Sequence, residues 1–368
     1  MIETRGLTRH FRAKGETVEA VRGIDLDVEA GELVAVLGPN GAGKSTTLRM
    51  LTTLLQPTAG TARVVGRDVT GDPAGVRRRI GFIGQGNSAG HTQRVRDEMI
   101  CQARCYGLDR REAAVRTDEL LASLGLDGLA GRVVSTLSGG QRRRLDVALG
   151  MVHRPDLLFL DEPSTGLDPQ NRVNLQEQIE RLRVTHGTTI VLTTHYLDEA
   201  DALADRVVVV DHGRVIADDT PERLKADLAG DRVAVTAAHV ADVPALVAAV
   251  ERTGAAQHLA SSGPVVTARV RGGSTLLPGL LRSLDGAGVV VAAAEVARPT
   301  LDDVFLALTG RSLREGADPS VPADQSDPSP PSESAVPADP ADQIGHADPA
   351  ASSVPVPAAV SAPMEQPS

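Results

Sequence analysis

The stretch from Gly38 to Thr46 matches the phosphate-binding pattern G-x-x-x-x-G-K-[ST]. Its three glycines allow successive backbone N–H groups to turn toward one anion, and the N-terminus of a following helix adds partial positive charge at the same place. Lys44 is placed to reach the β- and γ-phosphates of a nucleotide, and the Ser45 hydroxyl is placed to bind Mg²⁺. The stretch therefore predicts a loop that binds a polyphosphate; the alternative is a glycine-rich turn that matches by coincidence.

Two adjacent carboxylates, Asp161 and Glu162, follow the apolar run 157–160, which predicts a buried strand. We expect this strand to end on the side of the sheet where the phosphate loop opens. Asp161 suits a magnesium role, and Glu162 can orient or deprotonate an attacking water. A solvated pair of acids at a strand end is the alternative, but together with the phosphate loop the pair predicts hydrolysis of the nucleotide.

A second glycine-rich helix start lies at 137–141, where the Ser138 hydroxyl and the N–H groups of Gly139 and Gly140 can bind an anion. An enzyme that already holds its phosphates at 38–46 needs no second cradle in the same place. This segment therefore predicts a contact with a nucleotide held by another copy of the chain. His195 follows a predicted strand that ends at Thr194, where its side chain would reach a γ-phosphate.

Strands that alternate with helices position these motifs and predict a mostly parallel sheet covered on its faces. Residues 1–32 alternate apolar and polar positions, which favours antiparallel strands beside the nucleotide core. The region from about 97 to 149 has helical spacing. The remaining expected elements are strands at 33–37, 60–66, 80–85, 157–160, 188–194 and 207–210, and helices at 44–55, 138–149, 169–185 and 196–204.

The chain divides into a nucleotide-binding part at 1–230, a smaller α/β domain at 231–314 and a tail at 315–368. In the second part, helical spacing occurs at 243–250 and at 301–308, the latter opened by a capping box at 300–303. The tail carries, within residues 316–368, −8 of the formal net charge of −10 and holds 12 of the 23 prolines. We expect it to be disordered, and an acidic tail that folds on a partner is the alternative.

The composition limits which partners the chain can bind and in which compartment it is expected. Only six residues are aromatic, and residues 1–315 are nearly neutral in charge, which argues against nucleic-acid binding. No apolar run is long enough to span a bilayer and no signal peptide begins the chain, so we expect it to stay in the cytoplasm. Cys101 and Cys105 lie four apart in a helical stretch and are interpreted as buried or half-buried packing residues, with a metal or redox pair as the alternative.

The order of the motifs resembles that of an ATP-binding cassette (ABC) ATPase over residues 1–230. The resemblance implies a P-loop α/β fold of ABC type, with a mostly parallel sheet core, an antiparallel β subdomain and a helical subdomain, followed by a small α/β domain and the tail. It also implies ATP and Mg²⁺ as ligands. The matching segments are the loop at 38–46, Gln85 after a strand, 137–141, 157–162, the turn at 164–168, and His195.

The resemblance assigns a role to each matching residue. It implies that Glu162, His195 and Gln85 act in catalysis, and that Ser45, Gln85 and Asp161 surround the metal. Phe11 would stack on adenine, although a core aromatic on an edge strand is an equal interpretation. Residues implied to bind the nucleotide, in the same copy or in the opposing one, are Phe11, Gly38, Pro39, Asn40, Gly41, Ala42, Gly43, Lys44, Ser45, Thr46, Ser138, Gly139, Gly140, Gln141 and Asp168.

Two further stretches, 298–311 and 142–146, resemble ATPase subunits of daunorubicin-resistance-type exporters. This resemblance implies a homodimer at the cytoplasmic face of the membrane, beneath a separately encoded membrane subunit, which powers export of a drug or another amphiphile. A transporter ATPase for a lipid, polysaccharide or ion remains an alternative, as does a soluble ABC ATPase that acts on DNA or ribosomes. One region departs from the family pattern: Gln93 and Arg94 stand where an apolar residue and a threonine are usual.

Overall fold

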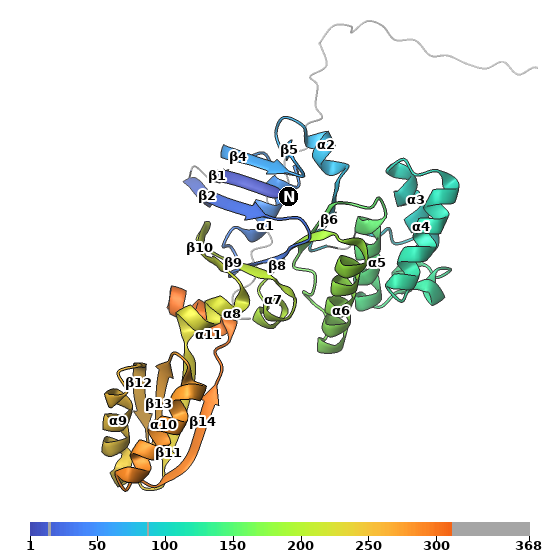
Figure 1. Ribbon diagram of the computed structural model, residues 1–368. Coiled ribbons are helices and arrows are strands. Elements are labelled where there is room, and N and C mark those ends of the chain that lie inside the picture. The colour runs from blue at the N-terminus through green and yellow to red at the C-terminus, as the bar shows by residue number, and fades with distance from the viewer. Residues whose placement is uncertain (14–15, 87, 311–368) are drawn as a thin grey trace, which may run out of the picture. The chain divides into compact units, whose positions relative to one another are not determined.

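The computed structural model describes residues 1–13, 16–86 and 88–310, so the predicted tail at 315–368 lies outside the described residues. Figure 1 shows the arrangement of the elements. The strands are β1 Ile2–Ala13, β2 Glu16–Val28, β3 Leu33–Leu37, β4 Ala59–Val64, β5 Arg67–Asp68, β6 Ile80–Ile83, β7 Leu157–Asp161, β8 Thr189–Thr194, β9 Arg206–Asp211, β10 Arg214–Asp219, β11 Asp231–Ala237, β12 Ala256–Ser262, β13 Val265–Val270 and β14 Val291–Ala297. The α-helices are α1 Lys44–Leu51, α2 Pro73–Arg77, α3 Val95–Cys105, α4 Arg110–Ser123, α5 Gly139–Met151, α6 Pro169–His186, α7 Leu197–Leu203, α8 Pro221–Leu224, α9 Val243–Arg252, α10 Gly273–Gly286 and α11 Leu301–Thr309.

A six-stranded sheet in the order β10-β9-β3-β8-β7-β6 forms the centre of the nucleotide-binding part. Its strands pair in parallel except for β10, which runs antiparallel to β9. The predicted mostly parallel sheet is therefore confirmed. Strand β10 was not expected, because an edge strand with alternating exposed positions and two terminal aspartates carries little apolar signal.

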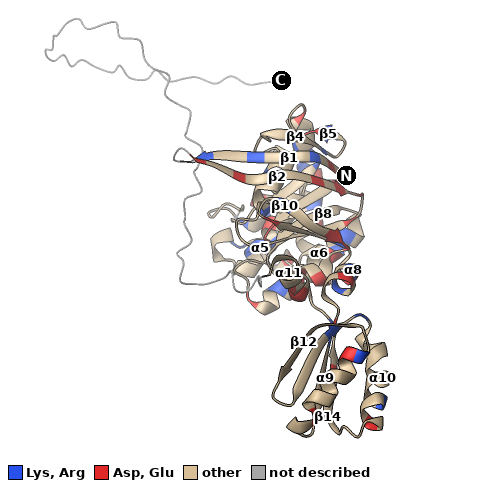
Figure 2. Ribbon diagram, turned by 90° about the vertical axis from the view of Figure 1, so that its left-hand side faces the viewer, with Lys and Arg blue, Asp and Glu red and all other residues tan. Residues whose placement is uncertain are grey.

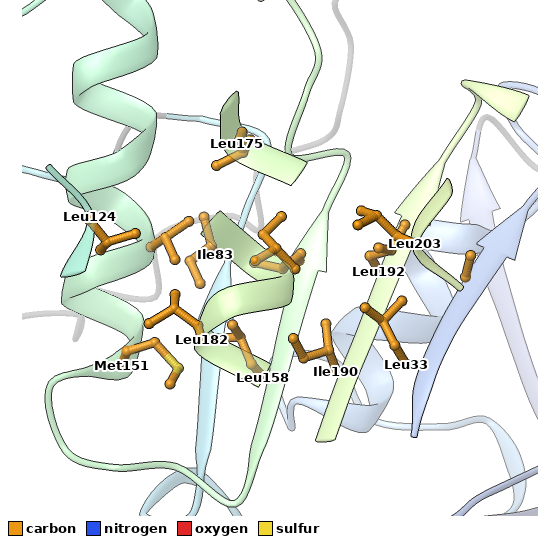
Figure 3. Close-up of a cluster of buried hydrophobic side chains, with 14 of the residues drawn as sticks. Leu33, Ile83, Leu124, Met151, Leu158, Leu175, Leu182, Ile190, Leu192 and Leu203 are labelled. Atoms are coloured by element: carbon orange, nitrogen blue, oxygen red, sulfur yellow. The ribbon is translucent and has the colours of Figure 1, made fainter. Parts of the chain in front are cut away.

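Each central strand contributes alternate side chains to two separate cores. In β3, Leu33, Ala35 and Leu37 join the core beneath α5, α6 and α7, part of which Figure 3 shows. Val34 and Val36 join a second core together with α1 and the antiparallel strands. Because both faces are covered, the strand reads as a continuous apolar run.

A second, antiparallel sheet has the order β2-β1-β4-β5, which confirms the strands expected at 1–32. Its inward side chains, such as Leu7, Ile24 and Leu26, are buried in the second core. Figure 2 shows basic and acidic positions interspersed along β1 and β2.

The helical region is also confirmed: α3, α4 and α5 lie within 95–151, and Leu120, Leu121 and Leu124 are buried as expected. The interpretation of the cysteines as packing residues was wrong, because both Cys101 and Cys105 are exposed. The buried face of α3 consists of Val95, Met99 and Ala103, spaced four apart. Positions 101 and 105 lie on the opposite side of the helix from this stripe.

Two predicted boundaries were too long. The helix expected at 44–55 ends at Leu51, because Thr53 adopts a left-handed backbone conformation with φ 64° and the helical hydrogen bonds cannot continue through it. The strand expected at 80–85 ends at Ile83. In both cases the element itself was predicted and only its end was misplaced.

Within residues 231–297, a four-stranded antiparallel sheet has the order β12-β13-β11-β14. Helices α9 and α10 pack on this sheet around a core of their own. Helix α11 opens with the expected capping box at Thr300 and Asp303, but its apolar residues Val304 and Phe305 join the core of the nucleotide-binding part. Strand β12 and helix α10 were not expected. Among the described helices, none has the length and apolar character that crossing a membrane requires.

Candidate nucleotide site

The phosphate loop connects the end of β3 to the start of α1. Gly43 stands at the N-cap of α1 with φ 101°, and a Cβ there would lie 2.5 Å from the carbonyl oxygen of Ala20. At Gly38 a Cβ would collide with the carbonyl oxygen of Val210. No side chain caps α1, so its first N–H groups remain available to an anion.

Lys44 points into the loop that precedes it. Its Nζ atom donates to the carbonyl oxygens of Gly38, at 2.7 Å, and Pro39, at 3.1 Å, and lies 3.5 Å from Glu162 Oε1. The side chain is only 4% exposed, and burial lowers the pKa of Lys44, although Glu162 opposes the shift. A buried ammonium whose partners are mostly carbonyl groups is well suited to exchange them for phosphate oxygens.

Asp161, at the end of β7, collects hydroxyl groups from two other elements. Its Oδ1 atom accepts from Ser45 Oγ at 2.9 Å and from Thr193 Oγ1 at 2.7 Å. The amide of Gln85, which follows β6, lies 3.5 Å from Ser45 Oγ. The structure therefore brings together all three residues that the sequence predicted around a metal.

Glu162 is held in a strained conformation beside them, with φ 46° at a non-glycine position. Its N–H donates to the carbonyl oxygen and the hydroxyl of Thr193, and its Oε2 atom accepts from Thr165 Oγ1 at 3.3 Å. Burial would raise the pKa of Glu162, but the contact with His195 and the charge of Lys44 outweigh burial and hold this pKa below its ordinary value. The carboxylate is thus kept ionised and able to accept a proton.

His195 lies in the turn between β8 and α7. Its Nδ1 atom is 3.4 Å from Glu162 Oε2, and its ring packs against Tyr196 with the ring centroids 4.2 Å apart. The Tyr196 ring in turn contacts the Arg172 guanidinium at 3.8 Å. The structure thus places His195 beside Glu162, while its predicted contact with a γ-phosphate stays a prediction.

A cleft of about 450 Å³ opens beside Lys44, Ser45 and Glu162. Its volume lies in the range of small-molecule sites. The residues that line it are Ala20, Asn40, Gly41, Ala42, Gly43, Lys44, Ser45, Thr46, Gln85 and Glu162.

The second glycine-rich turn is not part of this cleft. Ser138 and Gly139 are exposed, and Ser138 caps α5 through a reciprocal pair of bonds with Gln141. Asp168 is exposed as well and caps α6 by accepting from the N–H and the amide of Asn171. The amide of Asn171 lies so close to Gly140 that a Cβ there would overlap it, so these two helix starts are neighbours.

Phe11 is half-buried on β1 and is absent from the residues that line the cleft. Its ring contacts the Arg9 guanidinium at 4.8 Å. The residue of the antiparallel sheet that does line the cleft is Ala20, on β2. The proposed stacking of Phe11 on adenine stays a prediction.

Sequence reasoning missed two residues that organise the site. Thr193 is fully buried and bonds to both Asp161 and Glu162. Arg143 is buried in α5 and donates to the carbonyl oxygens of Gly84, Asp161 and Pro163. The sequence did not predict these contacts, because Thr193 stands within a partly apolar strand and Arg143 is one of three consecutive arginines.

Comparison with known proteins identifies the family. Residues 21–165 match the family model described as ABC transporter. The daunorubicin/doxorubicin resistance ATP-binding protein DrrA of Streptomyces peucetius is 44% identical over 328 residues, which cover 86% of this chain and 96% of the relative. The chain belongs to the ABC transporter ATP-binding proteins. As an ABC ATPase it binds ATP and couples ATP hydrolysis to transport.

Other ABC proteins show the breadth of the likeness. The Nod factor export ATP-binding protein I of Ralstonia nicotianae is 36% identical over 317 residues, which cover 86% of this chain and 95% of the relative. The ABC cassette MJ0796, solved as a dimer in a post-hydrolysis state bound to ADP and Pi, superposes with a TM-score of 0.55 at 24% identity, covering 60% of this chain and 98% of that one. This second likeness shows the ABC fold.

Proposed function

We propose that the chain is the ATPase subunit of an exporter whose cargo is a drug of the daunorubicin and doxorubicin kind or another amphiphile. The chain is 44% identical to a relative named for resistance to these drugs and 36% identical to one named for Nod factor export. Both relatives are matched over more than nine tenths of their length. The higher identity favours the drug, and a different exported cargo is the second candidate.

The observation that carries the proposed mechanism is the separation of two groups of residues. Lys44 and Glu162 line one cleft and His195 contacts Glu162, whereas Ser138 and Asp168 lie exposed outside this cleft. A head-to-tail homodimer would place the Ser138–Gln141 turn of each copy over the nucleotide of the other. The solved cassette MJ0796 forms a dimer with nucleotide, which supports this arrangement.

The oxygen atoms around Asp161 fit a magnesium ion. Its carboxylate, the Ser45 hydroxyl and the amide of Gln85 are hard donors of the kind that Mg²⁺ takes together with substrate phosphates. These three residues would hold the ion. When bound, the ion neutralises negative charge on the phosphates.

The protein groups then divide the work of hydrolysis. Lys44 and the free N–H groups at the start of α1 bind and orient the phosphates. Glu162 accepts a hydrogen bond or a proton from the attacking water, because its pKa is held below the ordinary value and it stays ionised. His195 contacts Glu162 and would donate to the γ-phosphate. Closure of the dimer would exclude water from this site.

A separately encoded membrane subunit would carry the cargo, and the chain would work at the cytoplasmic face of the membrane. The test is co-expression with candidate membrane subunits and purification of the complex, followed by ATPase assays with daunorubicin or doxorubicin. We expect ATPase activity that rises with drug concentration and disappears in the Glu162→Gln variant. Stimulation by a lipid, a polysaccharide or an ion in place of either drug would assign the second candidate.

A further inference from the structure

Helix α5 carries two buried charged residues, Arg143 and Asp146, of which the proposed hydrolysis makes no use. Their exposed fractions are 8% and 1%. The two residues are three apart and therefore share one face of the helix. Buried charges are costly unless their hydrogen bonds are made, so the partners of this pair show what the face supports.

The Arg143 guanidinium binds three carbonyl oxygens around the cleft. Its Nη1 atom donates to Gly84 at 2.8 Å, its Nε atom to Pro163 at 2.8 Å, and its Nη2 atom to Asp161 at 3.3 Å. Gly84 directly precedes Gln85, while Asp161 and Pro163 flank Glu162. One planar group therefore fixes the backbone beside both residues that face the reacting phosphate.

Asp146 holds the far side of the loop that follows Gln85. Its Oδ1 atom accepts from the N–H groups of Ser88 and Ala89, both at 3.0 Å. Its second carboxylate oxygen is buried with no hydrogen-bond partner among the described residues. Arg143 and Asp146 thus bind the chain before and after Gln85 to the same helix.

The same helix begins at the exposed Ser138 turn. Arg143 lies five residues beyond Ser138, about 7.5 Å along the axis, and the capping box makes the first turn of α5 well formed. A displacement of the Ser138 turn is therefore transmitted to Arg143 over fewer than two turns of helix. In the proposed homodimer, the Ser138 turn contacts the nucleotide of the other copy.

We propose that Arg143 and Asp146 are positioning residues through which α5 links the two nucleotide sites of the dimer. Contact of the Ser138 turn with the partner's nucleotide sets the position of α5, and Arg143 and Asp146 then set the backbone of Gln85 and Glu162 in the chain's own site. This inference rests on the proposed homodimer with shared sites.

The adjacent Arg144 supplies a matched control. It is also partly buried in α5 and also donates to backbone carbonyl groups, those of Gly140 at 3.4 Å and Leu124 at 3.0 Å. Neither carbonyl belongs to the segments around Gln85 or Glu162. Arg144→Lys therefore makes the same chemical change in the same helix without touching the backbone of the cleft.

The first experiment measures ATP affinity and kcat separately in the full chain. Arg143→Lys keeps the charge but loses the planar fork, and we expect kcat to fall about tenfold or more with little change in the Kd for ATP. Asp146→Leu should act in the same direction, whereas Asp146→Asn keeps the accepting oxygen and should stay within about threefold of the parent. Unchanged kcat in Arg143→Lys and Asp146→Leu, or an equal loss in Arg144→Lys, overturns the assignment.

The second experiment uses mixed dimers in which one copy carries Glu162→Gln, so that the remaining turnover occurs at the intact copy's Glu162. Ser138→Arg added to the Glu162→Gln copy should abolish this turnover; if it does not, the shared site itself is wrong. Arg143→Lys added to the Glu162→Gln copy should lower the same turnover about threefold or more. If Ser138→Arg acts across the dimer and Arg143→Lys does not, the link through α5 is overturned while the proposed function stands.

Discussion

The Gly38–Thr46 loop and the Ser138–Gln141 turn both start helices with glycines, yet their free hydrogen-bond donors differ. Helix α1 has Gly43 at its N-cap and no capping side chain. Helix α5 has Ser138 at its N-cap, and the reciprocal bonds with Gln141 satisfy part of its first turn. The first helix start therefore has no side chain that satisfies its N–H groups, whereas the second has part of its N–H groups satisfied within the turn itself.

The two regions also differ in how far their functional residues are buried. Lys44 is almost fully buried against Glu162, while Ser138 and Gly139 are exposed. The loop side is therefore prepared to bind ATP within one chain. In the proposed homodimer, the Ser138 hydroxyl and the N–H groups of the adjacent glycines would donate to a nucleotide that another copy holds. Nucleotide binding and nucleotide hydrolysis should consequently depend on different numbers of copies.

The largest effect should come from Glu162→Gln. Removal of the ionised carboxylate should lower kcat by about 10²- to 10⁴-fold, because the water loses its proton acceptor. ATP binding should persist, since Lys44 and the α1 N–H groups are intact, and the dimer should accumulate in its closed form. Size-exclusion chromatography with ATP detects the dimer, and a steady-state ATPase assay at saturating ATP measures kcat. Hydrolysis at the parent rate would show that another group accepts the proton.

A change on the exposed side should separate binding from turnover. Ser138→Arg should lower kcat by about 10²-fold through loss of a donor and steric exclusion of the partner's nucleotide. The Kd for ATP of the single chain should stay within about twofold, because the turn lies outside the cleft. Equilibrium binding of a fluorescent ATP analogue at a concentration where the chain is monomeric measures this Kd. Weakened binding by the isolated chain would break the distinction between the two regions.

A substitution of Phe11 tests whether ATP bound at the Gly38–Thr46 loop also contacts the antiparallel sheet. If its ring stacks on adenine, Phe11→Leu should weaken ATP binding about fivefold or more. Val18→Leu is a suitable control, because Val18 pairs with Phe11 across β1 and β2 and is exposed. Equal affinity of Phe11→Leu and the parent would leave Phe11 as a packing residue beside Arg9.

Sequence alone predicted the parts of the site that are local. The phosphate loop, the strand end at Asp161 and Glu162, and the helix starts at 138 and 169 are each encoded within about ten residues; the capping roles of Ser138 and Asp168 were not predicted. The exposure of the Ser138 turn could also be anticipated, because a glycine-rich turn with a serine cap needs no tertiary partner.

The contacts that join these parts could not be predicted. Thr193 reaches Asp161 because β8 lies beside β7 with these two residues in register, 32 positions apart in the chain. Arg143 reaches Gly84 only because α5 covers the end of β6. The prediction that Cys101 and Cys105 are packing residues was wrong for a related reason. Their spacing fits a helix face that could be buried, but the buried face of α3 is the opposite one, which carries Val95, Met99 and Ala103. Which of two possible faces is buried depends on neighbouring elements.

The smallest predicted effect concerns Glu199, a buried carboxylate outside the two compared regions. This residue of α7 follows His195 closely, and its fully buried carboxylate accepts a hydrogen bond from Ser164, in the turn that leads to Asp168. Burial raises the pKa of Glu199, although the Ser164 hydroxyl opposes the shift. The native state therefore binds this proton more tightly than the unfolded state does.

It follows that ionisation of Glu199 destabilises the fold as pH rises from the ordinary glutamate pKa toward the raised one. Glu199→Gln keeps an oxygen that can accept from Ser164 and removes the ionisation, so its melting temperature should exceed that of the parent by about 2–4 °C at pH 8 and by less at pH 5. Differential scanning calorimetry at both pH values measures the difference in melting temperature between Glu199→Gln and the parent. Asp146, whose pKa burial also raises, is present in both proteins, so its ionisation does not contribute to this difference. A difference of equal size at both pH values would mean that the buried carboxyl stays protonated throughout this range or that packing dominates. A difference that grows with pH would show that the buried Glu199 carboxyl ionises in the native state at a cost to stability.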